Sequence, residues 1–236
     1  MKTKVILALD VNSESEAFQV IDETFPYVDC FKVGSILYAE SGNSIINYIK
    51  QKGKEVFLDL KFFDIPNTVK GVSKIATRIG VDMFTIHLLG GVEMIKASIE
   101  GVNEAFDKCR LDKKPLILGV TILTSMNEEI INRDLKIGLN LSDMILHLAR
   151  MGYDNGLRGF VCSPHEISLL KSNISKDIVV VTPGVRLESD EKGDQKRVMT
   201  PEMAMKEGAD YIVVGRSILT KPDKEEVLRK LRETLS

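Results

Sequence analysis

Three charged side chains follow one another at the end of an otherwise apolar run of the sequence. Asp59 and Lys61 stand two residues apart in VFLDLK, and Asp64 follows just before Pro66 and Asn67. Residues two apart on a strand point to the same face, so the first two side chains are expected to lie together. Charged side chains are almost never buried without a partner, because their desolvation is costly. A polar cluster in this position therefore favours chemistry over stability.

A second cation, Lys32, lies near the end of another strand-like run, CFKVG. With Asp59, Lys61 and Asp64 it supplies two positive and two negative charges that could alternate in one network. Carboxylates beside an ammonium favour its charged form, and such a lysine is a poor base but a good proton donor to a carbon base. The alternative is a structural ion-pair cluster that ties strand ends together. Because burying such a network rarely offsets its desolvation, the catalytic interpretation is favoured.

Strand-like runs alternate with helical segments along the whole chain. Several runs are continuously apolar, which is typical of parallel strands covered on both sides. The runs are Val5–Asp10, Cys30–Gly34, Val56–Lys61, Met83–Leu88, Leu116–Leu123, Gly159–Ser163, Ile178–Pro183 and Tyr211–Gly215. Eight strand–helix units in 236 residues predict a (β/α)8 TIM barrel, with residues 1–236 as a single domain. An open doubly wound sheet is the alternative.

The segments between these strands carry the signals of helix ends. The helical segments include Ser13–Phe25, Ser35–Lys52, Gly91–Lys108 and Lys224–Leu235. Ser13, Ser35 and Asp223 are expected to be N-caps. Two connections, residues 124–141 and 184–199, are longer than the fold requires. Long loops in a compact domain are commonly lids over a site, although a tolerated surface insertion accounts for their length equally well.

Composition and charge argue against several classes of protein. A net charge of −2 without runs of Lys and Arg leaves no basic surface for nucleic acid or for a membrane. No apolar stretch approaches a membrane span, and the first residues lack the pattern of a signal peptide. Cys30, Cys109 and Cys162 are widely spaced in apolar surroundings, which predicts reduced thiols in a cytoplasmic protein.

Polar residues stand at nearly every carboxyl end of the predicted strands, where barrels of this kind place their active sites. In chain order they are Asp10, Lys32, Asp59 with Lys61, His87, Thr124 with Ser125, Arg186, and Gly215 with Arg216. Arg186, Gly215 and Arg216 occupy the usual phosphate position of the fold, where glycine admits backbone N–H groups and arginine adds a charged fork. His87 is expected to be structural. No His, Asp or Glu spacing resembles a metal site.

These motifs resemble those of the orotidine 5'-phosphate decarboxylase family over essentially the whole chain. The most specific is DLKFFDIPNT, residues 59–68, which matches D-x-K-x-x-D followed by I-P-N-T. ALD, FKVG, LTS, TPGVR, GDQKR and VGRSI follow in the order and spacing of the family. The resemblance implies a homodimeric carboxy-lyase that needs no metal or cofactor. Its expected reaction converts orotidine 5'-phosphate to uridine 5'-phosphate in de novo pyrimidine synthesis.

The resemblance also implies roles around the reacting carbon. Lys61 would deliver a proton to C6 of the pyrimidine as carbon dioxide leaves, and Asp59 would lie against the departing carboxylate. Lys32 would hold Asp59 and the ribose hydroxyls, and Asp10 would bind ribose. Asp64 would reach the same place from the neighbouring subunit.

The remaining site residues are implied by the same resemblance. Ile65 and Thr68 would accompany Asp64 across the dimer interface, and Thr124 with Ser125 would read the pyrimidine. The 5'-phosphate would be held by Arg186, Gln195, Gly215 and Arg216. Sugar-phosphate enzymes that share D-x-K-x-x-D form a magnesium-stabilised enediolate, so metal dependence separates them from this function. The other alternative is a protein that binds a nucleotide phosphate but has no catalytic activity, and the intact Asp–Lys array disfavours it.

Overall fold

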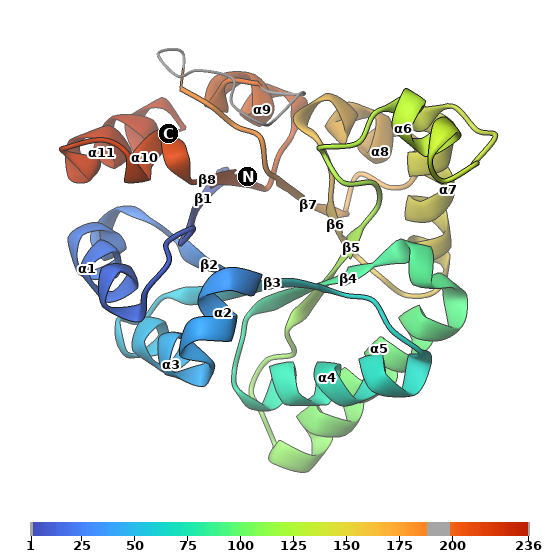
Figure 1. The fold of residues 1–236 in the computed structure, drawn as a ribbon, viewed down its shortest axis with the longest axis horizontal. Coiled ribbons are helices and arrows are strands. Elements are labelled where there is room, and N and C mark those ends of the chain that lie inside the picture. The colour runs from blue at the N-terminus through green and yellow to red at the C-terminus, as the bar shows by residue number, and fades with distance from the viewer. Residues whose placement is uncertain (1, 188–198, 236) are drawn as a thin grey trace.

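The chain forms a closed barrel in the computed structural model, which describes residues 2–187 and 199–235. Within these residues eight parallel strands pair in chain order, and β1 closes the barrel against β8 (Figure 1). They are β1 (Lys4–Ala8), β2 (Cys30–Gly34), β3 (Glu55–Phe62), β4 (Met83–His87), β5 (Leu116–Val120), β6 (Gly159–Val161), β7 (Val179–Thr182) and β8 (Tyr211–Val214). The closure confirms the predicted (β/α)8 barrel and excludes the open sheet.

Helices surround the barrel and connect its strands (Figure 1). The α-helices are α1 (Glu14–Thr24), α2 (Ser35–Ser41), α3 (Asn43–Gln51), α4 (Pro66–Arg78), α5 (Gly91–Cys109), α6 (Glu128–Arg133), α7 (Leu141–Asp154), α8 (Ile167–Asn173), α9 (Pro201–Glu207), α10 (Arg216–Leu219) and α11 (Lys224–Thr234). Short 3-10 turns are η1 (Phe25–Tyr27), η2 (Leu88–Gly90) and η3 (Pro164–Glu166). No helix in the described part of the chain is both long and apolar enough to cross a membrane.

Two apolar cores explain why the strands read as continuous apolar runs. One core fills the barrel interior and consists of Ile6, Ala8, Cys30, Phe57, Met83, Leu118, Val181 and Val213 with their partly buried neighbours. The other lies between the strands and the surrounding helices, and includes Leu7, Phe31 and Phe84. Successive side chains of a strand point to opposite faces, so Ile6 enters the first core and Leu7 the second. Both faces of the strands are therefore buried.

The predicted helix ends are confirmed at two of three N-caps. Ser13 accepts a hydrogen bond from the Glu16 N–H, and Asp223 accepts one from the Glu226 N–H. The prediction of Ser35 as a cap is wrong, because β2 runs straight into α2 and its last residue, Gly34, takes the cap position. The segment predicted as one helix is divided into α2 and α3 at Gly42, where φ is +55°.

The long connections at residues 124–141 and 184–199 are described to different extents by the structure. The first contains α6, so it is a folded segment rather than an open loop. The second falls largely on residues 188–198, outside the described residues. Its two ends are joined, because the Arg186 N–H donates to the Met199 carbonyl and the Met199 N–H donates to the Gly184 carbonyl. This bridge positions Arg186 beside the carboxyl end of β7.

Candidate active site

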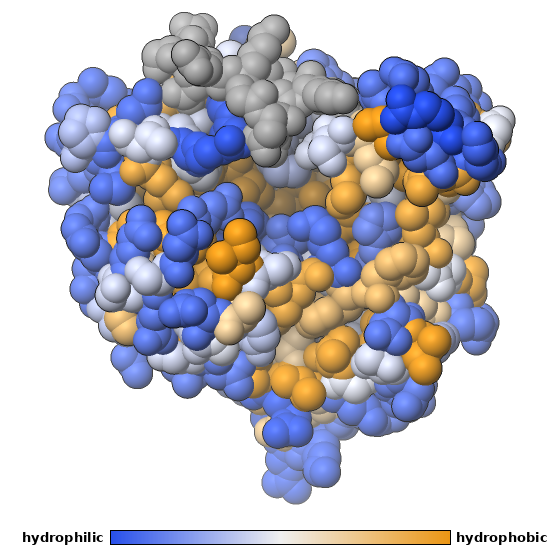
Figure 2. All heavy atoms as spheres, in the orientation of Figure 1, coloured by the Kyte–Doolittle hydropathy of each residue, from blue (hydrophilic) through white to orange (hydrophobic). Residues whose placement is uncertain are grey.

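A cavity of about 320 Å³ opens at the carboxyl ends of the strands. The space-filling view shows the hollow near the centre of this face (Figure 2). Most of the residues predicted from the sequence line it. They are Asp10, Lys32, Asp59, Lys61, Thr124, Ser125, Arg186, Gly215 and Arg216. Residues from opposite ends of the sequence thus converge on one cavity, as the barrel prediction requires.

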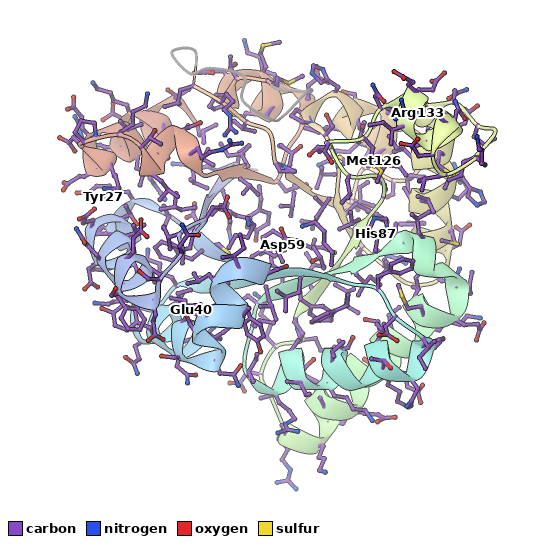
Figure 3. The ribbon with its side chains drawn as sticks, in the orientation of Figure 1. Tyr27, Glu40, Asp59, His87, Met126 and Arg133 are labelled. Atoms are coloured by element: carbon purple, nitrogen blue, oxygen red, sulfur yellow. The ribbon has the colours of Figure 1, made fainter. Side chains whose placement is uncertain are left out.

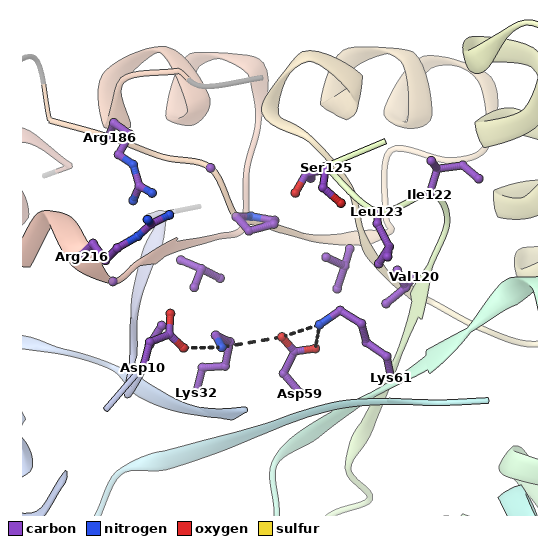
Figure 4. A pocket seen from close by; sticks show the side chains of 17 residues that line it. Asp10, Lys32, Asp59, Lys61, Val120, Ile122, Leu123, Ser125, Arg186 and Arg216 are labelled. Atoms are coloured by element: carbon purple, nitrogen blue, oxygen red, sulfur yellow. Dashed lines mark hydrogen bonds and ion pairs between the residues drawn. The ribbon is translucent and has the colours of Figure 1, made fainter. Parts of the chain in front are cut away.

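Four side chains form a row of alternating charge across the floor of this cavity (Figure 4). Lys32 Nζ lies 3.1 Å from Asp10 Oδ1 and 3.8 Å from Asp59 Oδ2. Lys61 Nζ lies 3.0 Å from each carboxylate oxygen of Asp59. The side chains of Lys32 and Asp59 are only 13% and 14% exposed, whereas that of Lys61 is 39% exposed. The row places a partly exposed ammonium inside the cavity and fixes it with a carboxylate.

The end of β3 departs from regular strand geometry where it carries this row. Leu58 pairs with Phe84 on β4, but the next pair joins Phe62 to Ile86. Asp59, Leu60 and Lys61 therefore lie opposite a single residue, and Lys61 has a φ of +48°. Positive φ is uncommon for a residue with a side chain, and bulges of this kind re-aim side chains beside active sites. Asp59 and Lys61 meet as predicted, although regular alternation is not what brings them together.

The residue opposite the bulge is Thr85, which the sequence analysis did not single out. Its side chain is fully buried. The Thr85 Oγ1 accepts a hydrogen bond from the Lys61 N–H at 2.8 Å and donates one to Asp59 Oδ1 at 3.0 Å. The available signal was a hydroxyl in the middle of the apolar strand Met83–Phe84–Thr85–Ile86, where a polar group needs a partner.

Arginine and glycine residues after β7 and β8 form another edge of the cavity (Figure 4). Arg186 Nη1 donates to Ser217 Oγ at 3.4 Å, which ties the β7 loop to α10. A Cβ at Gly215 would lie 3.3 Å from Asp10 Oδ2 and 3.4 Å from the Ala8 Cβ. Glycine therefore lets the backbone pass close to Asp10. This edge has the charge and the backbone access that an anionic group requires.

An apolar wall completes the cavity, and the sequence analysis did not identify it. Val120, Ile122 and Leu123 come from the β5 end, and Val161 and Val213 come from β6 and β8. Ligand sites typically combine such apolar walls with a few placed polar groups. The charged row, the arginine edge and this wall together suit a flat organic group that carries an anionic tail.

The segment with Asp64, Ile65 and Thr68 lies outside this cavity in the described chain. All three residues are exposed, and the Asp64 carboxylate accepts a hydrogen bond from its neighbour, the Ile65 N–H, at 2.7 Å. The sequence predicted that Asp64 would join Lys32, Asp59 and Lys61 in one network. Within one chain, Asp10 takes the place of Asp64 as the second carboxylate of that network. Gln195, the remaining predicted residue, lies outside the described residues.

A second cavity, of about 290 Å³, shares the charged row with the first. It is lined further by residues that follow β1 and β2, among them Asn12, Ser35 and Ile36. Ile36 is 70% exposed, and two other large apolar side chains, Phe63 and Ile65, are 61% and 67% exposed. Figure 2 shows apolar side chains gathered beside the hollow.

His87 ends β4 and lies beside the charged row without joining it (Figure 3). Its Nδ1 accepts a hydrogen bond from the Leu89 N–H at 3.4 Å, and its ring centroid lies 5.7 Å from that of Phe63. Burial lowers the pKa of the imidazole, and the nearby Lys61 charge lowers it further. These contacts agree with the structural role expected from the sequence.

Comparison with known proteins finds relatives across the whole chain. Residues 3–231 match the model of the Orotidine 5'-phosphate decarboxylase / HUMPS family. The orotidine 5'-phosphate decarboxylase of Dictyoglomus thermophilum is 41% identical over 231 residues, which cover 98% of this chain and 94% of that protein. The Coxiella burnetii enzyme of the same name is 41% identical over 228 residues, with 97% and 94% coverage. The structure of orotidine 5'-phosphate decarboxylase from Lactobacillus acidophilus is similar over 100% of both chains, with a TM-score of 0.87 at 32% identity.

Proposed function

Because this chain belongs to the orotidine 5'-phosphate decarboxylase family and is a carboxy-lyase, we propose that it protonates C6 of orotidine 5'-phosphate through Lys61, without metal or cofactor. The match over residues 3–231 confirms the family predicted from the sequence motifs. Its reaction is the decarboxylation that forms uridine 5'-phosphate in pyrimidine synthesis. The observation that carries the proposal is the Lys61 ammonium, held 3.0 Å from both oxygens of Asp59 within the cavity.

Loss of carbon dioxide creates the chemical problem that Lys61 solves. The electrons of the C6–carboxylate bond stay on C6 as that bond breaks, and the pyrimidine offers this carbanion no adjacent π sink. A preorganised cation is then the main source of stabilisation. Lys61 Nζ gives one proton to C6, so a C6–H bond replaces the C6–carboxylate bond and neutral carbon dioxide leaves. The resulting amine regains its proton from solvent.

The rest of the charged row orients this proton donor and the ribose. Asp59 lies against the departing carboxylate and holds Lys61 through both of its oxygens. Lys32 stands between Asp10 and Asp59, so it fixes Asp59 and reaches the ribose hydroxyls. Asp10 has a side chain that is 54% exposed, which leaves its carboxylate able to accept a ribose hydroxyl.

The two ends of the nucleotide fit the remaining edges of the cavity. Thr124 and Ser125 follow the apolar wall of β5 and supply polar contacts to the pyrimidine. The 5'-phosphate binds Arg186, Gly215 and Arg216, together with Gln195 from the β7 loop. Since the phosphate is remote from C6, its binding energy can support the ordering of the site around the reacting carbon.

The second cavity supports a homodimer with shared sites. It lies against the same row of charges and is lined by the exposed Ile36, and Phe63 and Ile65 are exposed apolar residues that follow the row on the chain. Apolar patches of this kind mark interaction surfaces, and a two-fold dimer brings the same surface of both subunits together. Asp64, with Ile65 and Thr68, then enters the second cavity of the partner. Each site would combine Lys61 of one subunit with Asp64 of the other.

Subunit mixing tests this shared site. Asp64→Ala and Lys61→Ala proteins are each expected to be inactive, but a hybrid dimer contains one site with both native residues. Complete random exchange makes half of the dimers hybrid, so about a quarter of the wild-type sites are restored. If activity stays absent after exchange is demonstrated with tagged subunits, Asp64 does not act across the interface.

The cysteines are compatible with a reducing compartment, and we propose that the enzyme works in the cytoplasm. Cys30 and Cys162 are buried, whereas Cys109 is exposed at the end of α5, so the prediction of apolar surroundings is wrong for Cys109. Burial raises the pKa of the Cys30 thiol, which disfavours the reactive thiolate. An exposed free thiol such as Cys109 persists where the cytosol keeps it reduced.

The decisive experiment follows decarboxylation of orotidine 5'-phosphate by ultraviolet absorbance, with and without a strong chelator. Turnover that the chelator does not change is expected. In the described part of the chain no group of three or more His, Cys, Asp and Glu side chains is arranged to hold a metal ion. Loss of turnover with chelator and recovery with Mg²⁺ would contradict the metal-free reaction. Failure with this substrate alongside Mg²⁺-dependent activity on a sugar phosphate would replace the proposed function.

A further inference from the structure

We propose that Thr85 is a positioning residue, which holds the bulge of β3 in the conformation that aims Lys61 and Asp59 at the substrate. The inference rests on the proposed function, because it concerns the same proton donor. Thr85 is fully buried and is not among the residues that line the described cavity. It therefore acts through Lys61 and Asp59 rather than on the substrate.

The backbone at the bulge departs from its regular register with β4. Between the pairs Leu58–Phe84 and Phe62–Ile86, three residues of β3 pass one residue of β4. The extra residues of a bulge lose their ladder hydrogen bonds. The Lys61 N–H instead donates to the Thr85 hydroxyl at 2.8 Å. A side chain thus replaces a carbonyl of the neighbouring strand, at the residue with the strained φ of +48°.

The same hydroxyl orients the carboxylate that holds the lysine. A hydroxyl has one proton to donate and two lone pairs to accept with. Since Thr85 Oγ1 accepts from the Lys61 N–H, its single proton is free to be donated to Asp59 Oδ1, which lies 3.0 Å away. One atom therefore links the backbone of the proton donor to the side chain of its carboxylate partner.

Thr85 differs from the other donors to Asp59 in its rigidity. Lys32 and Lys61 reach Asp59 through long, flexible side chains, so they alone do not determine the plane of the carboxylate. Threonine is branched at Cβ, which restricts χ1, and this one is buried on a barrel strand. Its hydroxyl is therefore held in one position, and its two hydrogen bonds align the Lys61 backbone and the Asp59 carboxylate.

Removing the hydroxyl should reduce the rate of proton transfer more than it reduces nucleotide binding. Without its acceptor, the Lys61 N–H is left without this partner in a partly buried region, and the bulge relaxes. A displacement of about 1 Å in a reacting group costs about 100-fold in rate. The phosphate edge, on β7 and β8, lies across the barrel from Thr85 and should keep its affinity (Figure 1).

Three variants separate positioning from general stability. Thr85→Val keeps the shape but has no hydroxyl, and its kcat should fall about 100-fold while the affinity for uridine 5'-phosphate, measured by calorimetry, stays near that of the wild type. Thr85→Ser retains the hydroxyl and should retain most of kcat. Thr77→Val makes the same substitution at another buried threonine, whose hydroxyl donates to the Ser73 carbonyl within α4, and should leave kcat unchanged. If Thr85→Val does not fold, Thr85→Ala removes the same group.

Amide hydrogen exchange on the wild type tests the contact without reference to catalysis. The Lys61 N–H should exchange slowly in the wild type and in Thr85→Ser, and faster in Thr85→Val. Fast exchange in the wild type would overturn the proposal, as would equal kcat in Thr85→Val and wild type, or equal losses in the valine and serine variants. A wild type without turnover refutes the proposed function instead, which is a different result.

Discussion

The two ends of the barrel use aspartate in contrasting ways. At the amino ends of the strands, Asp29, Asp82 and Asp210 stand immediately before β2, β4 and β8. Each accepts a hydrogen bond of 2.8 Å from the N–H of the second residue in the preceding strand, namely Val5, Val56 and Val180. Each also contacts one cation, which is Arg232, Lys50 or Lys171 respectively. These carboxylates join neighbouring strands through the backbone.

At the carboxyl ends, Asp10 and Asp59 contact side chains instead. Lys32 lies between them, and Lys61 contacts Asp59 from the other side. A backbone N–H cannot change partner without unfolding its strand, whereas an ammonium on a flexible stem can exchange a carboxylate for a ligand. Aspartates at the two ends therefore differ in their hydrogen-bond partners rather than in their burial, since Asp82 and Asp59 have side chains that are 15% and 14% exposed.

The largest contrast is expected between two lysines that each contact an aspartate. Lys61→Ala removes the proton donor, so kcat should fall by at least about 10³-fold while uridine 5'-phosphate still binds. Lys171→Ala removes the equivalent contact to Asp210 at the other end and should retain kcat. Steady-state absorbance assays and calorimetry measure both. Near-normal turnover by Lys61→Ala would refute the role of Lys61 as proton donor. The lysines at the two ends of the barrel would then not differ in function.

Two arginines extend the contrast to substrate binding. Arg216→Ala loses a charged contact to the phosphate, worth about 1.5–3 kcal/mol, so kcat/KM should fall about 10- to 100-fold. Arg232→Ala, which removes the cation beside Asp29, should leave kcat/KM unchanged. A ligand without the phosphate provides the check, because wild type and Arg216→Ala should bind it equally. If Arg216→Ala also lost affinity for that ligand, Arg216 would support the structure of the site rather than bind the phosphate.

The amino-end aspartates should affect stability alone. Asp82→Ala leaves the Val56 N–H without its acceptor, and the free energy of unfolding should fall by about 1–3 kcal/mol. Denaturant titration measures this, and kcat per folded molecule should be unchanged. Asp82→Asn is the matched control, because its amide oxygen can still accept from Val56. A fall in kcat without a fall in stability would contradict the assignment of this end.

The smallest effect concerns His87, which reports on the charge of Lys61. Its pKa lies below the ordinary 6.5 because of burial and, secondarily, because of the lysine. Lys61→Ala should therefore raise the pKa of His87, which NMR titration of the imidazole measures. As pH falls below 6.5, the unfolded state binds this proton before the folded state does, so the histidine should reduce stability at lower pH. An unchanged pKa in the variant would show that the two groups do not interact.

The strands were predictable because barrel strands are buried on both faces. Short, continuously apolar runs such as Tyr211–Val214, separated from one another by helical segments, are typical of parallel strands. Their ends were less certain. The run after Leu116 stays apolar as far as Leu123, but β5 ends at Val120, because Ile122 and Leu123 leave the sheet to line the cavity. Apolar character alone does not distinguish a strand from the wall of a site.

Most of the polar residues that line the candidate site were predictable from the sequence, but their geometry was not. The spacing predicts Asp59 and Lys61 on one face of a regular strand, whereas they meet through a bulge in which Lys61 has positive φ. Thr85 was missed because a hydroxyl within an apolar strand indicates that it needs a partner but does not show which residue the partner is. Its partners are 24 and 26 residues away along the chain, and only strand pairing brings them within reach.

The barrel, the family and most of the polar groups that converge at the strand ends could be predicted from the sequence. These follow from residue type, order and spacing, which are properties of the chain before it folds. Three features arise only in the folded protein: the two-residue excess on β3 opposite β4, the pairing of Asp10 rather than Asp64 with Lys32, and the place of the Thr85 hydroxyl. Each of these depends on a contact between segments distant in sequence, and such contacts exist only once the strands have closed into a barrel.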